Sequence, residues 1–170
     1  MTPTRVLIEE HELIEHALAV LDGARQLMMS GGGVPMGTFE KVLAFFHSFA
    51  VGCHQAKEEQ VLFPLLKGKP IPFVLQERGQ EQALLGSMVE ALPELCTSAA
   101  ARSRFAHSAA AYRQLLRHRI AQENAMLQRL ESGVLTVEES QDVLQGFSGY
   151  QSAQVDSLSS WAAGLERGGL

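Results

Sequence analysis

His54 and Glu58 lie four residues apart at the end of an apolar stretch, and their side chains are well suited to binding a metal. On a helix, residues i and i+4 share one face, so the imidazole and the carboxylate would point the same way. A helical bundle that turns such a pair inward can hold iron or manganese. The competing interpretation is a surface helix stabilised by ion pairs, in which Lys57 and Glu59 are solvated charges.

Helices are the elements that must position this pair, because apolar residues recur at steps of three and four almost throughout the chain. The first helix is capped by Thr2 or Thr4 and ends at Ser30, where glycines follow. A capping box formed by Thr136 and Glu139 predicts the start of the last helix. The further helices are expected at about 38–63, 72–92 and 98–130, and the last one at about 136–165.

This pattern predicts an all-α fold, an up-and-down four-helix bundle with an additional C-terminal helix. The bundle covers about residues 4–131 of a single domain that spans residues 1–170. Gly146 and Gly149 weaken the middle of the C-terminal helix. That helix is expected to cover the bundle, and the alternative is that it mediates a homodimer.

Composition limits the classes of partner. The net charge is −5, the pI is about 5.7, and no strong Lys/Arg cluster is present, which argues against nucleic-acid binding. No apolar run reaches the length of a membrane span. The first residues are not followed by the apolar core of a signal peptide, so we expect a cytoplasmic protein. Cys53 and Cys96 form no zinc or redox spacing and are expected to be buried thiols.

Polar residues on the predicted inner faces of the first two helices need an explanation, because a bundle interior should be apolar. The first helix turns His11 inward. The second turns His47 and His54 inward, one heptad apart, and Glu58 follows one turn later. A single such histidine is usually a hydrogen-bonded core residue, whereas several that converge point to a site.

The third and fourth helices add further polar groups to the same interior. The best apolar face of the third helix brings Arg78 and Gln82 inward, and a weaker face, rotated by one position, brings Glu77 and Glu81 inward. The fourth helix turns Arg119 and Glu123 inward. This convergence from all four bundle helices is the strongest functional signal in the sequence.

Several motifs make the chain resemble the hemerythrin-like (HHE cation-binding) family. They are Glu10-His11, the stretch Cys-His-Gln-Ala-Lys-Glu-Glu at 53–59, Leu62-Phe63-Pro64 and Gln122-Glu123-Asn124. Proteins similar to this are four-helix bundles around a non-haem di-iron centre that bind or sense oxygen, or handle iron or nitric oxide. The resemblance implies metal-ligand roles for His11, His54, Glu58 and Glu123.

The chain departs from the family at two positions. Family members tend to carry histidines at about Arg78 and Arg119, whereas a guanidinium is always charged and has no lone pair for a metal. His118 precedes Arg119, but its five-residue step to Glu123 departs from one-turn spacing.

An intact di-iron centre, as in the family, is the least favoured form of the site, and two other forms rank above it. In the form that we favour slightly, the protein is metal-free or binds metal weakly, and Arg78, Arg119 and Gln82 replace the metals by pairing with Glu58 and Glu123. In the other form, a reduced site holds one iron, manganese or zinc ion. Its ligands would be His11, His54 and Glu58, aided by Glu123 and His118.

Three classes of function are open at this point. A metal-loaded protein would bind oxygen or nitric oxide, or store or sense iron. A metal-free protein would act as an interaction scaffold. An iron-dependent oxidase or peroxidase ranks last, because an enzyme also needs an open metal position and a substrate channel.

Overall fold

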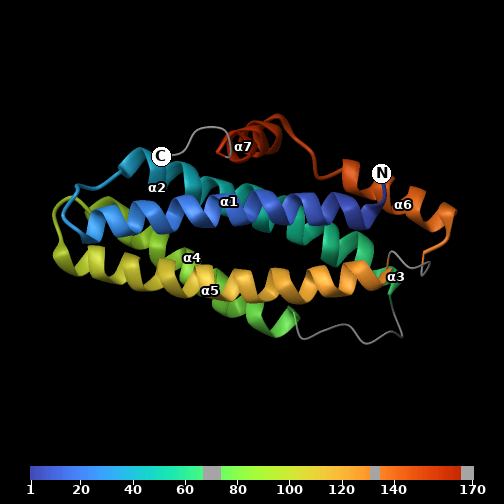
Figure 1. Ribbon diagram of the computed structural model, residues 1–170, viewed down its shortest axis with the longest axis horizontal. Coiled ribbons are helices and arrows are strands. Elements are labelled where there is room, and N and C mark those ends of the chain that lie inside the picture. Colours follow the sequence, from blue (N-terminus) through green and yellow to red (C-terminus); the bar gives the residue numbers. More distant parts are fainter. Residues whose placement is uncertain (67–73, 131–134, 166–170) are drawn as a thin grey trace.

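The computed structural model describes residues 1–66, 74–130 and 135–165, and this part of the chain is helical without any strand. Figure 1 shows α1, the rod that begins with α2, α4 and α5 lying side by side along the long axis. The all-α bundle predicted from the sequence is therefore confirmed. The predicted turn at 67–70, the helix start at Pro72 and the stop at Ser132-Gly133 lie outside the described residues.

Helix α1 spans Pro3–Met29 and has the predicted ends. Thr2 is the N-cap, with its side chain accepting a hydrogen bond from the backbone N–H of Arg5. Pro3 occupies the first turn, where its missing N–H costs nothing. The helix ends at Ser30, ahead of Gly31, which adopts a positive φ of 84°.

The second rod begins as α2 at Met36–Phe45 and then changes geometry. It continues as the π-helices η1, Phe46–Gln55, and η2, Glu58–Leu62, and ends as α3, Phe63–Leu65. The sequence predicted a single helix over 38–63, so its extent was right and its geometry was not. Hydrogen bonds from i to i+5 widen each turn, so seven residues no longer make two turns. His47 is consequently exposed while His54 is buried, and the prediction that both face inward was wrong.

Helix α4 spans Val74–Ala91 and leads through the 3-10 turn η3, Leu92–Glu94, into α5, Ala99–Leu130. Pro93 ends the α-helical path where the sequence predicted a stop. Helices α4 and α5 run side by side in Figure 1.

The C-terminal region forms two helices rather than the one predicted. Helix α6 spans Val137–Ser148 and starts with the predicted capping box of Thr136 and Glu139. Helix α7 spans Ala153–Gly164 and begins at Ser152, whose side chain accepts a hydrogen bond from Val155 N–H at 3.2 Å. Helix α7 packs on α1 and η1 and covers that side of the bundle.

Two apolar clusters divide the interior along its length. The larger contains aromatic contacts such as Phe39–Phe105 and Phe46–Tyr112, with ring centroids 4.5 and 5.0 Å apart. The smaller lies at the end near α6 and contains Leu7, Leu62 and Leu127, among other residues. Between these clusters, α1, η1, η2 and α5 each carry a buried polar residue.

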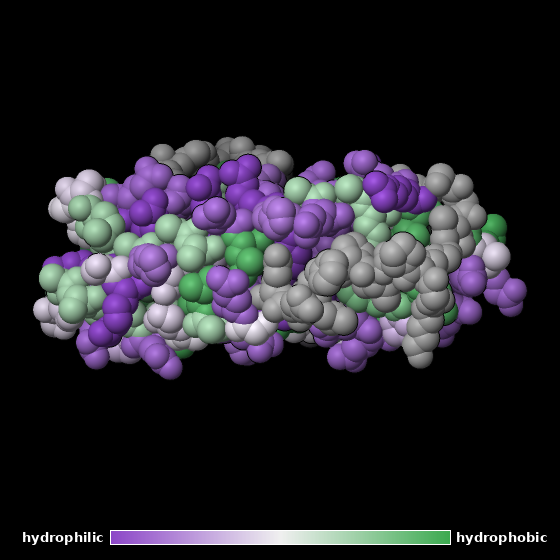
Figure 2. Space-filling model, turned by 90° about the horizontal axis from the view of Figure 1, so that it is seen from below, coloured by the Kyte–Doolittle hydropathy of each residue, from purple (hydrophilic) through white to green (hydrophobic). Residues whose placement is uncertain are grey.

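Within the described residues, no helix is both long enough and apolar enough to cross a bilayer. On the visible part of the face in Figure 2, hydrophilic and hydrophobic residues are interspersed.

Cys53 is buried as expected, but Cys96 is exposed, so the prediction of two buried thiols was half wrong.

Candidate metal centre

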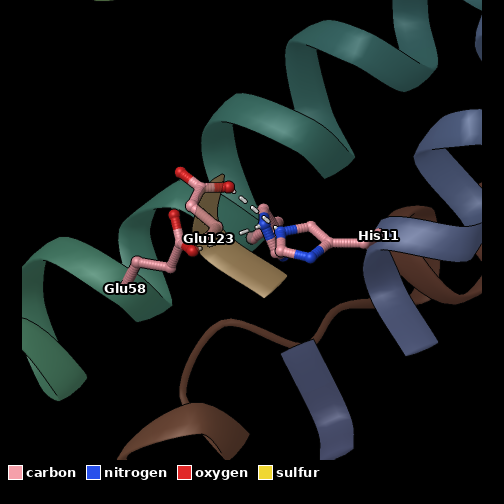
Figure 3. A group of neighbouring side chains, drawn as sticks. His11, Glu58 and Glu123 are labelled. Carbon is pink, nitrogen blue, oxygen red and sulfur yellow. Dashed lines mark ion pairs between the residues drawn. The ribbon is translucent and has the colours of Figure 1, made fainter. Parts of the chain in front are cut away.

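Four side chains from three rods meet between the two apolar clusters. His11 comes from α1, His54 from the end of η1, Glu58 from the start of η2, and Glu123 from α5. One donor atom of each lies within 4.8 Å of the others, and the residues are 0–1% exposed. Metal–ligand bonds of roughly 2.0–2.2 Å place opposite ligands about 4 Å apart, so the group is close to the size of a single-ion site. Figure 3 shows Glu58 and Glu123 turned toward the histidine side of the group.

The tautomer of His11 is set by Asn124. Nδ1 of His11 lies 2.6 Å from Oδ1 of Asn124, and because an amide oxygen can only accept, Nδ1 carries the proton. Nε2 then carries no proton, and its lone pair is free to accept a hydrogen bond or bind a metal. It lies 3.1 Å from Oε2 of Glu123 without forming a hydrogen bond. Two acceptors thus face each other in the interior.

His54 is arranged in the same way by a different partner. Its Nδ1 donates a hydrogen bond to Oε2 of Glu10 at 2.9 Å. Nε2 is therefore unprotonated, and it lies 3.8 Å from Oε1 of Glu58. The other oxygen of Glu10 accepts a hydrogen bond from Lys57, which is 2% exposed and not the solvated charge of the surface-helix interpretation. Partners of this kind fix the ring orientation of metal-binding histidines and raise their basicity.

Arg78 and Arg119 approach the same two carboxylates from the other side. Nη2 of Arg78 lies 3.6 Å from Oε2 of Glu58, and Nε of Arg119 lies 3.3 Å from Oε1 of Glu123. Each carboxylate therefore presents one oxygen to a histidine and the other to an arginine. The prediction that Arg119 rather than His118 faces inward is correct, because Arg119 is buried and His118 is exposed.

The inner face of α4 differs from both predicted faces. Arg78 and Glu81 are buried, whereas Gln82 is exposed, so the prediction that Gln82 joins the ion pairs was wrong. The predicted face also required Val89 inside, but Val89 is 48% exposed and Met88 is buried instead. The side chain of Glu77 lies outside those that the structure describes.

Glu81 anchors the arginine side of the group. It accepts a hydrogen bond from Arg119 through one oxygen and one from Nε2 of Gln55, at 2.7 Å, through the other. Arg78 has a second partner in Glu59, whose side chain is 36% exposed. Both guanidinium groups are thus held by one carboxylate of the histidine group and one carboxylate outside it.

Burial sets the protonation preferences. It lowers the pKa of His54 to about 4, so the ring is neutral at pH 7. It raises the pKa of Glu58 well above its usual value, and the nearby charge of Glu123 adds to this effect. Burial alone would also raise the pKa of Glu123 and Glu10, but the adjacent His11 and Arg119 lower that of Glu123, and the hydrogen bond to His54 together with the charge of Lys57 lowers that of Glu10.

The group and its partners carry excess negative charge. Glu10, Glu58, Glu59, Glu81 and Glu123 supply five negative charges, and three cations oppose them, namely Lys57, Arg78 and Arg119. With neutral imidazoles, as metal binding requires, the five negative and three positive charges leave a net charge of −2. Glu59 is partly exposed, but the other four carboxylates and all three cations are buried, and net charge in such a group is costly, so this arrangement favours the uptake of protons or of a dication.

Sequence reasoning assigned no role to four residues that hold the group in place, namely Glu10, Gln55, Lys57 and Asn124. A fifth, Glu81, was placed inward only on the weaker of the two predicted faces of the third helix. Two signals were available: Glu10 and Asn124 adjoin His11 and Glu123 in the family-like motifs, and Lys57 follows His54 by three residues. Residues three apart share a helix face, so Lys57 and His54 can reach the same partner.

Comparison with known proteins gives one family. No curated protein and no solved structure matches the chain. The model of the hemerythrin HHE cation-binding domain matches residues 2–130, which include α1, α4, α5 and the π-helices with all four donor residues. The chain therefore belongs to the hemerythrin HHE cation-binding domain family.

Proposed function

We propose that the protein binds a single divalent transition-metal ion through His11, His54, Glu58 and Glu123. The observation that carries this proposal is the orientation of their donor atoms. Nε2 of both histidines and both oxygens of both carboxylates are buried without a hydrogen-bond partner among the described residues. Unsatisfied buried acceptors are costly, and a shared cation satisfies both Nε2 atoms and one oxygen of each carboxylate at once, while the other two oxygens face Arg78 and Arg119.

A single ion also suits the charge of the group. A dication neutralises the excess of two negative charges, whereas two dications would reverse it. Two arginines further disfavour a second ion, because Arg78 lies against the second oxygen of Glu58 and Arg119 against the second oxygen of Glu123. Guanidinium groups cannot ligate a metal and repel one. The proposal therefore combines a reduced metal site with arginines in place of the second ion.

Imidazole and carboxylate together suit iron, manganese and zinc, and family membership favours iron among them. A ferrous ion with these ligands keeps open positions for a small neutral ligand such as oxygen or nitric oxide. Such a ligand leaves the balanced charge of the group unchanged. Binding or sensing of such a molecule is the function that the geometry supports best.

The metal-free protein is the second candidate, and the arginine contacts favour it. Both guanidinium groups reach the carboxylates without any ion, so protonation of Glu58 would leave a smaller charge for the fold to tolerate. In this form Arg78 holds α4 to η2, and the pair of Arg119 with Glu81 holds α5 to α4, so that the protein acts as a scaffold.

Metal titration separates the two candidates. Chelator-treated protein is titrated anaerobically with Fe²⁺, and in parallel with Co²⁺, whose visible spectrum reports the ligand set. We expect one ion per chain, lost in His11→Ala and His54→Ala and kept in the matched surface variants His107→Ala and His118→Ala. Wild-type protein that takes up neither ion would rule out the metal site and leave the scaffold.

A further inference from the structure

We propose that a cavity between α1 and α5 is the route by which the metal ion enters, and that Glu12 and Glu15 draw cations to its mouth. This inference rests on the proposed metal site. The need for a route follows from burial, since the four donor residues are 0–1% exposed in the folded protein. An ion must therefore pass between helices to reach them.

The cavity has a volume of about 240 Å³ and reaches a candidate ligand directly. His11 and Asn124, which are hydrogen-bonded to each other, are part of its wall. His11 is 1% exposed, and its Nε2 faces Glu123, so the same side chain belongs to both the cavity and the metal group. An ion in the cavity is thus separated from the group by one imidazole and its amide partner.

The rest of the cavity wall combines acidic and apolar side chains, which together attract cations. Glu12 and Glu15 contribute carboxylates, His16 contributes an imidazole, and Ile8 is one of the apolar side chains beside them. Carboxylates in a hollow with apolar walls concentrate cations and raise their rate of association. Glu15 also pairs with Arg117 at 3.2 Å, but that arginine side chain is 54% exposed and leaves the pair accessible to solvent.

Asn124 can take part in the transfer. It is half-buried, and its Oδ1 is an oxygen donor of the kind that divalent cations accept. When the hydrogen bond to His11 opens, Oδ1 becomes available to the incoming ion, and rotation of the freed ring can present the unprotonated Nε2 to it. The hydrogen bond re-forms once the ion lies among the four donors, and it then again fixes the ring.

A second cavity, of about 390 Å³, lies beside the first along α1, against α7, and is the competing route. Glu12 and His16 line both cavities, whereas Glu15 and His11 line only the α1–α5 cavity. The α1–α7 cavity reaches Glu10, which is not one of the four donors. Both oxygens of Glu10 are already engaged, one by His54 and one by Lys57. An ion in the α1–α7 cavity meets a carboxylate whose two oxygens are already hydrogen-bonded, and the His54 ring still lies between that ion and the four donor residues. The cavity that touches His11 is the shorter path.

The two cavities permit matched variants on one helix. Ile8 lines only the α1–α5 cavity and Val6 only the α1–α7 cavity, so Ile8→Trp and Val6→Trp each fill one of them. The rate of Co²⁺ uptake by chelator-treated protein is followed by stopped-flow absorbance. We expect Ile8→Trp to slow uptake and release about tenfold with little change in equilibrium affinity, and Val6→Trp to leave both rates unchanged.

Charge variants provide a second test that does not depend on packing. Glu15 and Glu9 are both half-exposed, both pair with an arginine on the surface, and line different cavities. Glu15→Gln is expected to slow uptake about threefold at low salt, with the difference shrinking as salt rises, and Glu9→Gln is expected to have no effect.

Each outcome shows whether the metal ion enters through the α1–α5 cavity. Slower uptake in Ile8→Trp and Glu15→Gln alone supports the α1–α5 route. Slower uptake in Val6→Trp and Glu9→Gln alone overturns it in favour of the other cavity. Equal rates in all four variants overturn it in favour of entry by opening of the bundle. Wild-type protein that shows no cobalt spectrum at any time overturns the proposed function itself, and the route with it.

Discussion

Nε of Arg119 lies 3.3 Å from Oε1 of Glu123, one turn later on α5, while the other oxygen of Glu123 faces His11. The carboxylate thus joins a candidate ligand to a fixed cation. Arg78 and Glu58 repeat this arrangement on the facing helices. In each case the arginine faces the carboxylate oxygen that is turned away from the histidine.

Replacing both arginines should therefore create a second metal position. The double variant Arg78→His and Arg119→His frees one oxygen of Glu58 and one of Glu123 and adds two neutral imidazoles. We expect the metal content after anaerobic iron loading to rise from one ion per chain to two, measured by elemental analysis of desalted protein. Arg104→His, an exposed position on α5, controls for an added histidine. An unchanged stoichiometry of one in the folded double variant would show that the arginines do not occupy a metal position.

Glu10 should control how tightly the metal binds without touching it. In Glu10→Gln, the acceptor for His54 becomes a neutral amide, and the buried Lys57 loses its partner. Loss of such a supporting carboxylate weakens metal affinity by about 10–100-fold. Stranding the lysine charge destabilises the fold by about 3–5 kcal/mol.

The two effects of Glu10→Gln can be separated. Adding Lys57→Met removes the stranded charge, so unfolding in denaturant should return toward the wild-type midpoint while cobalt affinity stays reduced. Glu9→Gln, at the neighbouring exposed position, should change neither quantity. Full recovery of affinity in the double variant would assign the whole effect to stability.

The stability of the metal-free protein should depend on His54 and Glu58 with opposite signs. The folded state keeps His54 neutral down to a pKa of about 4, so its contribution is lost as pH falls below 6.5. For this group alone, the loss between pH 6.5 and pH 5 is about 1–2 kcal/mol. The raised pKa of Glu58 acts the other way, because the folded state takes up a proton more readily than the unfolded chain and gains stability as pH falls.

Variants at these two positions make the signs measurable. In chelator-treated protein, the free energy of unfolding of His54→Asn should fall less than that of wild type between pH 6.5 and pH 5. That of Glu58→Gln should fall more steeply than wild type, because the opposing contribution is gone. Parallel pH profiles for the three proteins would contradict the assigned protonation states.

The sequence was sufficient for the extents of the bundle helices and for placing His11, His54, Glu58 and Glu123 on their inner faces, because periodicity and family-like motifs are local signals, but it did not reveal that the C-terminal region divides into α6 and α7. It failed where local geometry changed: the π-helices turned His47 outward, since an α-helical period had been assumed. It also misplaced Gln82, because apolar periodicity alone gave α4 two competing faces. Buried ion pairs such as Glu10–Lys57 look like surface charges in a single sequence, and only the packing of α1 against η1 brings the pair together.

Gly146 and Gly86 should respond oppositely to substitution by alanine. A Cβ at Gly146 would lie 2.7 Å from Cγ1 of Val61, a β-branched side chain with little freedom to move. Gly146→Ala should therefore push α6 away from η2 and destabilise the fold by about 1–3 kcal/mol. A Cβ at Gly86, in α4, meets no atom within 4 Å, so Gly86→Ala should stabilise the fold by about 0.4–1 kcal/mol.

The Gly146 substitution also tests whether α6 supports the metal group. Helix α6 carries Phe147, whose ring centroid lies 5.6 Å from Nζ of Lys57, and Lys57 in turn holds Glu10 against His54. Displacing α6 should thus loosen this chain of contacts and weaken cobalt binding, whereas Gly86→Ala should leave affinity unchanged. If Gly146→Ala lowers the denaturation midpoint but binds cobalt as tightly as wild type, then α6 contributes to packing alone, and the orientation of His54 is fixed within the bundle.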